Sequence, residues 1–301
     1  MITVRVPATS ANLGPGFDAV GLALRLHNTL ELWAADAPLI DVEGEGRETL
    51  PRNASHLAHR AATAVVDRAG RARGTTAPRA FGIRQHNRIP LARGLGSSAA
   101  AIVGGALAAN ALLGDPLDRQ ALLDLATEIE GHPDNVAAAL LGGLVVCAGT
   151  PSGVRAMRLA PPPLSVVAAV PDFAVSTGEA RRLLPSRVPF DDAVFNVTRT
   201  ALLVAALSGG RPDLLGDATE DRLHQPYRAA LIPGLTEVFA AARRAGANGV
   251  ALSGSGPTVL AFGGPPGVGP AMAEAFGAAG VRCRTLDLQI DTEGAVVETR
   301  A

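Results

Sequence analysis

The segment at residues 89–101, IPLARGLGSSAAA, constrains the fold of this chain more than any other. A strand-like stretch, RAFGIRQHNRI, precedes it, and an alanine-rich stretch ending near Leu113 follows it. This order predicts a strand, a tight turn and a buried helix. Gly94 and Gly96 allow positive φ angles and a close approach of the backbone. Because the helix would begin at the serine pair, its free N–H groups and positive dipole end would face an anion at the turn.

The chain contains no lysine, since all 27 of its basic residues are arginine. Schiff-base enzymes, and nucleotide sites that depend on a phosphate-binding lysine, are therefore excluded. A glycine–serine turn can still bind phosphate through backbone amides, and a serine hydroxyl there can ligate Mg²⁺. Two alternatives stay open for the turn taken by itself: an ordinary strand–turn–helix junction with a serine cap, and a serine nucleophile. The second lacks the G-x-S-x-G spacing of a nucleophile elbow.

Composition indicates a globular protein with a large core. The 301 residues are 48% hydrophobic and 18% charged, which is enough apolar material for a sizeable core. The net charge is −1, so the chain lacks the excess of basic residues that would indicate a nucleic-acid partner. Apolar runs fall short of the roughly 20 residues of a membrane span, and the alternating start ITVRV differs from a signal peptide. We therefore expect a cytoplasmic protein with no nucleic-acid or membrane partner. Cys147 and Cys283 form no metal motif, and Cys147 is expected to pack as a small hydrophobe.

Strand-like and helical patterns alternate along the chain without a strict βαβ rhythm. They predict an α+β protein with two domains, residues 1–160 and 161–301. In the first domain we expect strands at residues 2–6 and 19–34, with a turn-rich loop TSANLGPGFD at residues 9–18. A helix is expected between Ser55 as N-cap and Gly70 as C-cap. In the second domain, LSVVAAVP and GVALSGSGPTVLAFG predict strands, and NVTRTALLVAALSGG and GLTEVFAAARRAGANG predict amphipathic helices.

Several sequence blocks resemble one enzyme family. PLARGLGSSAAA closely resembles the ATP loop of the GHMP small-molecule kinases. ATSANLGPGFDAVGLAL at residues 8–24 is similar to the N-terminal motif of the homoserine kinase branch, and ALSGSGPTVLAF at residues 251–262 is similar to the C-terminal glycine motif. EGHPDNVAAALLGG and VSTGEARRLLP resemble the same branch. The blocks occur in family order and span nearly the whole chain, so the chain is identified as a member of this branch.

The resemblance implies a ribosomal-S5-like N-terminal domain and a ferredoxin-like C-terminal domain. It also implies ATP- and Mg²⁺-dependent phosphorylation of the side-chain hydroxyl of L-homoserine to O-phospho-L-homoserine, on the route to threonine. ATP would lie along a loop formed by Pro90, Leu91, Ala92, Arg93, Gly94, Leu95, Gly96, Ser97, Ser98, Ala99 and Ala100.

By the same resemblance, homoserine would bind between the domains. Arg181 and Arg228 would hold its carboxylate through bidentate hydrogen bonds, and Asn12 and Asp18 would contact its ammonium and hydroxyl ends. The other expected substrate residues are His132, Thr177 and Gly254, with the N–H groups of Gly254 and Gly256 as donors. Without the resemblance, a surface ion pair is the ordinary role of such arginines, NLGPGFD is a plain turn, and the histidine is structural or solvated.

Asp134 and Asn135 are expected to begin a helix, where both residue types are favoured as caps. Mevalonate kinases are thought to use an aspartate in this region as a base, whereas homoserine kinases have an asparagine, here Asn135. The resemblance therefore implies transfer by alignment and charge stabilisation without a dedicated base, and the role of Asp134 stays open. Ser98 and Glu130 would ligate Mg²⁺, with Glu128 as the alternative carboxylate.

Other functions are left open by the sequence. One is another GHMP-type kinase, such as a mevalonate kinase-like enzyme, and a second is a nucleotide-binding protein without catalysis. A serine hydrolase is the remotest, because no elbow or ordered triad is present. A homodimer also stays open.

Overall fold

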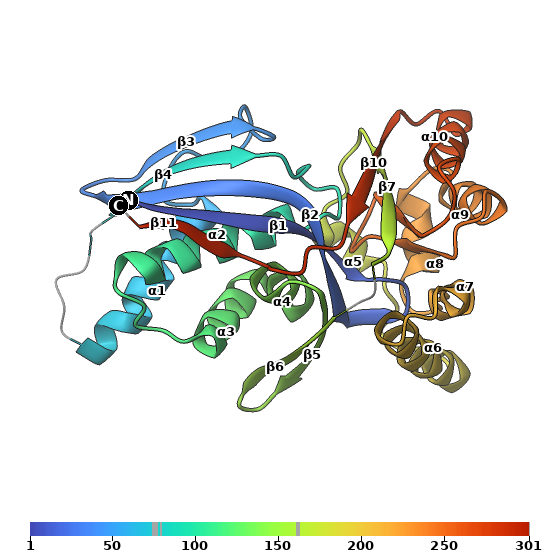
Figure 1. Cartoon of the computed structure of the whole chain (residues 1–301), viewed down its shortest axis with the longest axis horizontal. Coiled ribbons are helices and arrows are strands. Elements are labelled where there is room, and N and C mark those ends of the chain that lie inside the picture. The colour runs from blue at the N-terminus through green and yellow to red at the C-terminus, as the bar shows by residue number, and fades with distance from the viewer. Residues whose placement is uncertain (74–77, 79, 161–162, 301) are drawn as a thin grey trace.

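The computed structural model describes residues 1–73, 78, 80–160 and 163–300, which form two halves arranged side by side (Figure 1). The first half is built on a seven-stranded sheet in which β11, β1, β2, β4 and β3 follow in that order, and β5 and β6 extend from β2. Its strands are β1 (Ile2–Asn12), β2 (Gly16–Ala35), β3 (Leu39–Gly44), β4 (Ala80–Asn87), β5 (Leu144–Thr150), β6 (Gly153–Leu159) and β11 (Val296–Arg300). One face is covered by helices α1 (Leu57–Arg73), α2 (Ser97–Leu112), α3 (Arg119–Glu130) and α4 (Pro133–Leu141).

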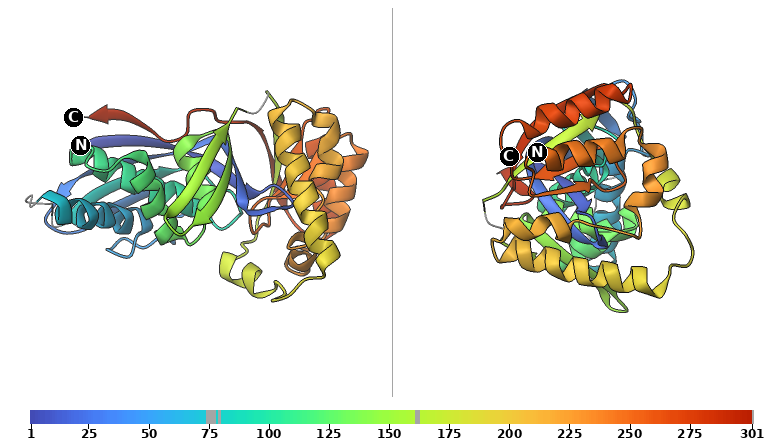
Figure 2. Two further views of the ribbon diagram at one scale, coloured as in Figure 1. Left: turned by 90° about the horizontal axis from the view of Figure 1, so that it is seen from below. Right: turned by 90° about the vertical axis from the view of Figure 1, so that its right-hand side faces the viewer.

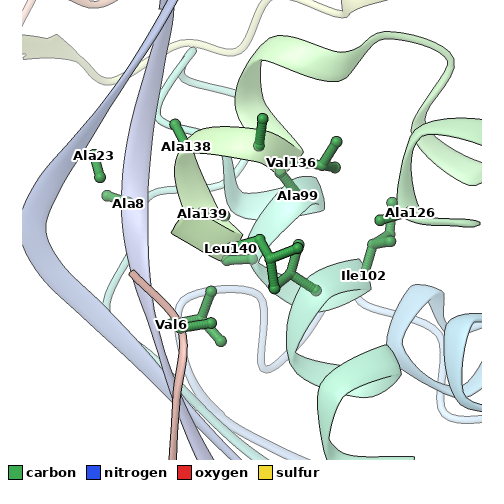
Figure 3. Close-up of a cluster of buried hydrophobic side chains, with 14 of the residues drawn as sticks. Val6, Ala8, Ala23, Ala99, Ile102, Ala126, Val136, Ala138, Ala139 and Leu140 are labelled. Atoms are coloured by element: carbon green, nitrogen blue, oxygen red, sulfur yellow. The ribbon is translucent and has the colours of Figure 1, made fainter. Parts of the chain in front are cut away.

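Helix α2 is apolar on all sides, and it lies buried between the sheet and the neighbouring helices. Its small side chains allow close packing, since a Cβ on Gly105 would lie 2.2 Å from the carbonyl oxygen of Ala58 in α1. Figure 3 shows apolar side chains where α2 meets its neighbours: Ile102 belongs to α2 itself, Leu140 to α4 and Val6 to β1. Dense packing of this kind holds a helix rigidly, so the position of its N-terminus is fixed.

The second half contains an antiparallel sheet in the order β10, β7, β9, β8. Its strands are β7 (Ser165–Pro171), β8 (Gly249–Leu252), β9 (Val259–Phe262) and β10 (Cys283–Gln289). Its helices are α5 (Thr177–Arg182), α6 (Phe190–Ser208), α7 (Leu215–Ala218), α8 (Gln225–Arg228), α9 (Leu235–Arg244) and α10 (Val268–Ala278). Helices α6, α9 and α10 lie toward the outer end of this half, away from the first (Figures 1 and 2). The predicted α+β class is confirmed.

Two segments cross between the halves. The hairpin of β1 and β2 extends from the first sheet until its tip reaches the second half (Figure 1). At the other end of the chain, β11 returns to the first sheet and pairs with β1, with Ile2 opposite Arg300, so the termini lie close together (Figure 2). The division at residue 160 stays a prediction, to which the structure adds that the last strand belongs to the first sheet. Residues 161–162, beside the predicted boundary, lie outside the described residues.

Some local predictions were wrong. The loop expected at residues 9–18 is only a short tip, because β1 continues to Asn12 and β2 already begins at Gly16. Gly70 lies inside α1, which continues to Arg73, so it is no C-cap. Ser55 is not the N-cap of α1, because the helix begins two residues later, at Leu57. Its hydroxyl donates to Asn53 Oδ1 at 2.7 Å instead. Cys147 is buried in β5, as predicted.

Within the described residues, every helix is too short or too polar to span a lipid bilayer.

Candidate active site

A cavity of about 760 Å³ lies between the two halves. Its walls come from the hairpin of β1 and β2, the first turns of α2 and α4, the end of α3, helices α5 and α8, and the turn between β8 and β9. Most residues predicted for the site line it: Asn12, Asp18, Leu91, Ala92, Arg93, Gly94, Leu95, Gly96, Ser97, Ser98, Glu130, His132, Asp134, Asn135, Thr177, Arg181, Arg228 and Gly254. The fold therefore gathers residues that are as many as 242 positions apart.

Part of the predicted ATP loop does not line this cavity. Ala99 and Ala100 are 0% and 2% exposed, because they already belong to α2 and face the core. Pro90 lines a separate hollow with Val170 and Pro171 of β7. The part of the loop that reaches the cavity therefore ends at the serine pair.

The glycines of the loop are required by protein packing. Gly94 and Gly96 have φ angles of 75° and 71°, which favour glycine. A Cβ on Gly94 would lie 2.1 Å from the carbonyl oxygen of Ser253, and one on Gly96 would lie 1.9 Å from Thr9 Oγ1. The residue at the N-cap of α2 is Gly96, and within the described residues no side chain caps this helix. The alternative of a serine cap was therefore wrong, and the first N–H groups of α2 face the cavity edge unprotected by a side chain.

Ser98 and Glu130 place two side-chain oxygens close together beside this loop. Ser98 Oγ donates to Glu130 Oε1 at 2.6 Å. Burial raises the pKa of Glu130, although the hydrogen bond from Ser98 works in the opposite direction. Glu128 points elsewhere, since its carboxylate accepts a hydrogen bond from Arg68 at 2.6 Å on the exposed surface of the first half. Of the two glutamates, only Glu130 therefore lines the cavity.

The first turn of α4 presents a histidine, an aspartate and an asparagine to the cavity. His132 Nδ1 lies 2.9 Å from Asp134 Oδ1, and the same oxygen accepts the backbone N–H of Asn135 at 2.8 Å. Burial alone would lower the pKa of His132, but the hydrogen bond and charge of Asp134 outweigh it and raise that pKa. Thr9 Oγ1 donates to Asn135 Oδ1 at 2.8 Å. Asp134 and Asn135 are thus fixed by their neighbours before any ligand binds.

The hairpin carries Asn12 and Asp18 in left-handed backbone conformations, with φ angles of 70° and 54°. Asn and Asp tolerate this region better than most residues. Asn12 Oδ1 accepts the N–H of Asp18 at 3.0 Å, and Asn12 Nδ2 donates to the carbonyl of Gly254 at 3.2 Å. Asn12 therefore fixes the backbone at Asp18, and it also links the hairpin to the second half.

Two arginines of the second half flank the hairpin. Arg181 binds both carboxylate oxygens of Asp18, at 3.0 Å and 2.5 Å. Arg228 is 2% exposed, and burial together with the charge of Arg181 lowers its pKa to about 10. The Cζ atoms of Arg181 and Arg228 lie 5.2 Å and 5.4 Å from the centre of the Phe17 ring. The aromatic ring thus holds both guanidinium groups near one another.

The turn after β8 contributes differently from the prediction. The N–H groups of Gly254 and Gly256 donate to the carbonyls of Ala11 and Ser253, so the expectation that they serve as substrate donors was wrong. It is the Gly254 carbonyl that accepts hydrogen bonds from side chains of the site. The turn lies so close to the hairpin of β1 and β2 that the N–H of Gly254 donates to the backbone carbonyl of Ala11.

One wall of the cavity was missed in the sequence. It includes His56, Gln85 and Asn87, all of which are buried. Within the described residues, both ring nitrogens of His56, Gln85 Oε1 and Asn87 Oδ1 have no hydrogen-bond partner. Burial lowers the pKa of His56 to about 4. A signal was present, because Gln85 and Asn87 share the inward face of β4 with Ile83, and polar residues on such a face need partners.

The sequence matches two family models, the N-terminal domain of the GHMP kinases over residues 56–143 and their C-terminal domain over residues 202–282. A protein of Moorella thermoacetica named homoserine kinase is 53% identical over 300 residues, which cover 99% of this chain and 100% of the relative. The chain belongs to the homoserine kinase family of the GHMP kinases. The homoserine kinase of Carboxydothermus hydrogenoformans is 48% identical over 98% of this chain and 96% of its own length.

Solved structures agree with this membership of the homoserine kinase family. The crystal structure of homoserine kinase from Cytophaga hutchinsonii has a TM-score of 0.85 at 31% identity, covering 98% of this chain and 96% of that one. A putative homoserine kinase of Listeria monocytogenes has a TM-score of 0.76 at 32% identity with full coverage of both chains. The predicted two-domain GHMP kinase fold is confirmed. Membership makes the chain a phosphotransferase that uses ATP as co-substrate.

Proposed function

We propose that this member of the homoserine kinase family transfers the γ-phosphoryl group of ATP to the side-chain hydroxyl of L-homoserine, giving O-phospho-L-homoserine for threonine biosynthesis. One observation carries the proposal. A single cavity holds the glycine–serine loop and the Ser98–Glu130 pair at one place, and Asp18 with two arginines at another. Phosphate chemistry and amino-acid recognition therefore share one space.

The amino-acid end of homoserine would bind at Asp18, Arg181 and Arg228. In the unliganded protein Arg181 and Asp18 neutralise each other. A zwitterion can replace this pair, because its ammonium takes the place of Arg181 on Asp18 and its carboxylate takes the place of Asp18 on Arg181. A sugar has no charge to compensate either partner of this ion pair, and mevalonate has a carboxylate for Arg181 but no ammonium for Asp18. The charge arrangement therefore favours an amino acid over mevalonate-like or sugar substrates.

Ser98 and Glu130 fit a Mg²⁺ site. Their oxygen atoms lie 2.6 Å apart beside the start of α2, and hard oxygen donors suit this ion, which completes its octahedron with waters and phosphate oxygens. When bound, the ion supplies charge neutralisation at the phosphates. The N–H groups of the first turn of α2 take the place of the absent lysine by donating to phosphate oxygens.

Transfer would proceed by positioning, without a dedicated protein base. Asn135, which stands where mevalonate kinases are thought to carry an aspartate, has no basic group. Asp134 is buried, and its Oδ1 is already used by His132 and by the N–H of Asn135. Phosphoryl transfer with a loose transition state needs alignment and charge stabilisation more than early proton removal. His132 and Asn12 line the same space and would orient the hydroxyl.

The base of ATP would lie along the wall that holds His56, Gln85 and Asn87. The unpartnered oxygens of Gln85 and Asn87 are acceptors, and the amino group of adenine is a donor. Apolar side chains of Leu50, Leu57 and Leu91 line the same wall and can cover the faces of a purine ring.

A coupled ADP-release assay with homoserine, mevalonate, serine and galactose tests the proposal. We expect a clear preference for homoserine, measured as kcat/KM, and a requirement for Mg²⁺. A preference for mevalonate or galactose would assign the chain a different alcohol as substrate. ATP binding without turnover on any of the four would leave only a nucleotide-binding role.

A further inference from the structure

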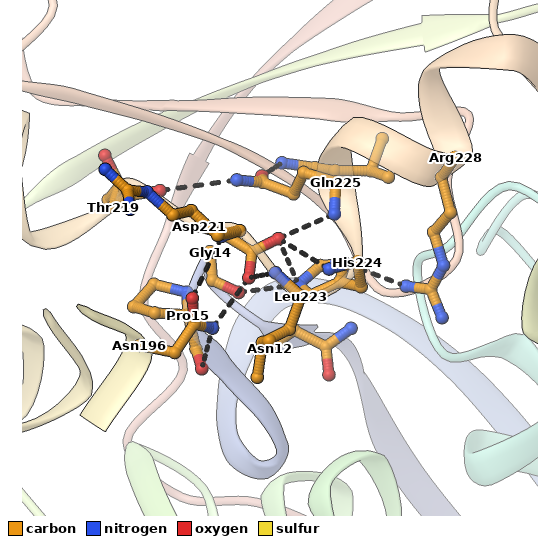
Figure 4. Close-up of polar contacts among 12 residues, drawn as sticks. Asn12, Gly14, Pro15, Asn196, Thr219, Asp221, Leu223, His224, Gln225 and Arg228 are labelled. Carbon is orange, nitrogen blue, oxygen red and sulfur yellow. Dashed lines mark hydrogen bonds and ion pairs between the residues drawn. The ribbon is translucent and has the colours of Figure 1, made fainter. Parts of the chain in front are cut away.

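His224 lies next to Arg228, a residue that lines the cavity, and it takes no part in the proposed reaction. It is fully buried at the start of α8. Its ring contacts the hairpin of the first half on one side and the arginine on the other (Figure 4). His224 Nε2 lies 2.6 Å from the carbonyl oxygen of Gly14, and His224 Nδ1 lies 3.1 Å from Arg228 Nη1.

These contacts determine where the proton of the imidazole is. A guanidinium nitrogen can only donate, and a carbonyl oxygen can only accept. Nδ1 of His224 must therefore be the acceptor for Arg228, and Nε2 must carry the hydrogen that is donated to Gly14. Only the neutral ring with its proton on Nε2 satisfies both partners. Burial lowers the pKa of His224 to about 4, which keeps the ring neutral near pH 7.

The same contacts determine which edge of Arg228 is available. Nη1 has two hydrogens, and it donates to His224 Nδ1 at 3.1 Å and to the carbonyl of Gly254 at 2.8 Å. Both hydrogens of Nη1 are therefore used inside the protein. Nε is buried and, in the part of the chain that the structure describes, has no hydrogen-bond partner. The hydrogens of Nε and Nη2 are therefore the ones that no protein group accepts in the described structure, and a carboxylate that binds Arg228 would have to take them.

His224 is itself held in place by Asp221. The carboxylate of Asp221 accepts the backbone N–H groups of Leu223, His224 and Gln225 at 2.9, 3.0 and 2.6 Å. Its Oδ2 also lies 3.5 Å from His224 Nε2, which favours a proton on that nitrogen. Asn196 Nδ2 donates to Asp221 Oδ1 at 2.7 Å and to the carbonyl of Pro15 at 3.3 Å. Hydrogen bonds from Asn196 and His224 of the second half thus fix the tip of the hairpin next to Arg228.

We propose that His224 is a positioning residue that turns the Nε–Nη2 edge of Arg228 toward the carboxylate of the amino-acid substrate and fixes the Gly14 carbonyl of the hairpin that carries Asn12 and Asp18. This inference rests on the proposed function, because that function places a carboxylate beside Arg228. It assigns the specificity for a carboxylate to a residue that need not touch the substrate.

Two substitutions separate the two hydrogen bonds of His224. The side-chain amide of His224→Gln can reach the place of Nε2 and keep the bond to Gly14, but it leaves Arg228 Nη1 without its acceptor. The shorter amide of His224→Asn can keep an acceptor at the place of Nδ1 while it loses the bond to Gly14. His86→Gln changes an exposed histidine of β4 outside the cavity and serves as the control.

We expect His224→Gln to raise the KM for homoserine on the order of ten-fold, with little change in the KM for ATP. His224→Asn should recover most of the affinity for homoserine and show the lower melting temperature of the two. With 3-aminopropan-1-ol, which is homoserine without its carboxylate, wild type and His224→Gln should have equal kcat/KM. An unchanged homoserine KM in His224→Gln, or an equal loss with both substrates, would overturn the proposal.

Nitrogen-15 NMR of the imidazole in the wild-type protein gives a test that needs no variant. We expect the proton on Nε2 at neutral pH, and a ring protonated on Nδ1 would also overturn the proposal, even if both variants failed to fold. The proposed function fails separately, if the wild-type protein phosphorylates no amino-acid alcohol in the substrate panel. In that case the NMR result still decides whether His224 holds Arg228 as described.

Discussion

Arg181 and Asp18, 163 residues apart, form a two-pronged ion pair across the cavity, with Nη1–Oδ2 and Nη2–Oδ1 distances of 3.0 Å and 2.5 Å. Both side chains are about one-third exposed, at 36% and 35%, so the pair is accessible to a ligand. A substrate with both an ammonium and a carboxylate group can exchange with it charge for charge. The site thus holds one negative and one positive group, Asp18 and Arg181, which match the ammonium and the carboxylate of the amino acid that it is proposed to bind.

Replacement of Arg181 by alanine should weaken homoserine binding selectively. A charge-assisted hydrogen bond is worth about 1.5–3 kcal/mol, which corresponds to a rise of about 10- to 100-fold in the KM for homoserine. The KM for ATP should change little, because the glycine–serine loop is not altered. Arg182→Ala, which removes the exposed neighbouring arginine, is the matched control. An Arg181→Ala enzyme with the wild-type KM for homoserine would remove Arg181 from the substrate site.

Glu130→Gln should reduce the apparent affinity for Mg²⁺ by about 10- to 100-fold, as changes close to a metal commonly do. The physical reason is the loss of a carboxylate charge beside Ser98 Oγ, 2.6 Å away. Titration of activity with Mg²⁺ at saturating ATP measures the effect. Glu128→Gln is the control, since its carboxylate pairs with Arg68 on the surface and should leave the titration unchanged. Equal effects of the two substitutions would contradict the assignment.

Asp134→Asn tests whether a protein base takes part. The amide keeps an oxygen that can accept from His132 and from the N–H of Asn135, so the first turn of α4 should remain folded. General base catalysis typically contributes about 10²–10⁴-fold, and we expect a smaller loss of kcat than this. If kcat nearly disappears while both KM values and the melting temperature are preserved, Asp134 is the base and transfer by positioning alone is wrong.

Gly96→Ala should destabilise the protein by about 1–3 kcal/mol. The reason is a positive φ of 71° combined with a Cβ position 1.9 Å from Thr9 Oγ1. Gly277→Ala is a suitable comparison, because that glycine lies within α10 and its Cβ would meet no atom within 4 Å in the described structure. Its alanine should raise stability by about 0.5–1 kcal/mol through helix propensity. Thermal unfolding of both variants decides the matter, and equal melting temperatures would contradict the packing argument.

Stability should fall as the pH falls from about 6.5 to about 4. Burial lowers the pKa of His56 and of His224 from 6.5 to about 4 in the folded protein, so the unfolded chain takes up these protons first. Each histidine then costs about 1.4 kcal/mol of unfolding free energy per pH unit within that window. His132 does not oppose this loss, because its pKa is raised and its contribution is lost only as the pH rises.

Urea unfolding at pH 7, 6 and 5 measures this dependence. In His56→Gln one of these two histidines is absent, so its stability should decline less steeply with acid than that of the wild type. Parallel curves for the two proteins would show that His56 does not stay neutral in the folded state.

The local sequence was sufficient for the parts of the site that depend on short-range chemistry. The positive φ angles of Gly94 and Gly96, the start of α2 at Ser97 and the beginning of α4 after His132 all agree with the residue preferences of turns and helix ends. The sequence blocks also identified the family, because each is a contiguous set of residues around one such turn. Turn chemistry is encoded within a few residues, so it can be read without the fold.

Only the tertiary structure decided which long-range partners these residues have. Glu128 and Glu130 lie in the same turn of α3, yet packing of that helix turns one toward Arg68 and the other toward Ser98. In the turn after β8, the N–H of Gly254 faces the protein because the hairpin of the first half approaches it, and the N–H of Gly256 bonds within the turn itself. His224 and Arg228 are four residues apart, but their joint orientation depends on the Gly14 carbonyl, 210 residues away from His224. The sequence by itself determined the turns, the helix starts and the family, whereas the packing of one half against the other determined which atoms face the substrate, because that packing depends on contacts between distant segments.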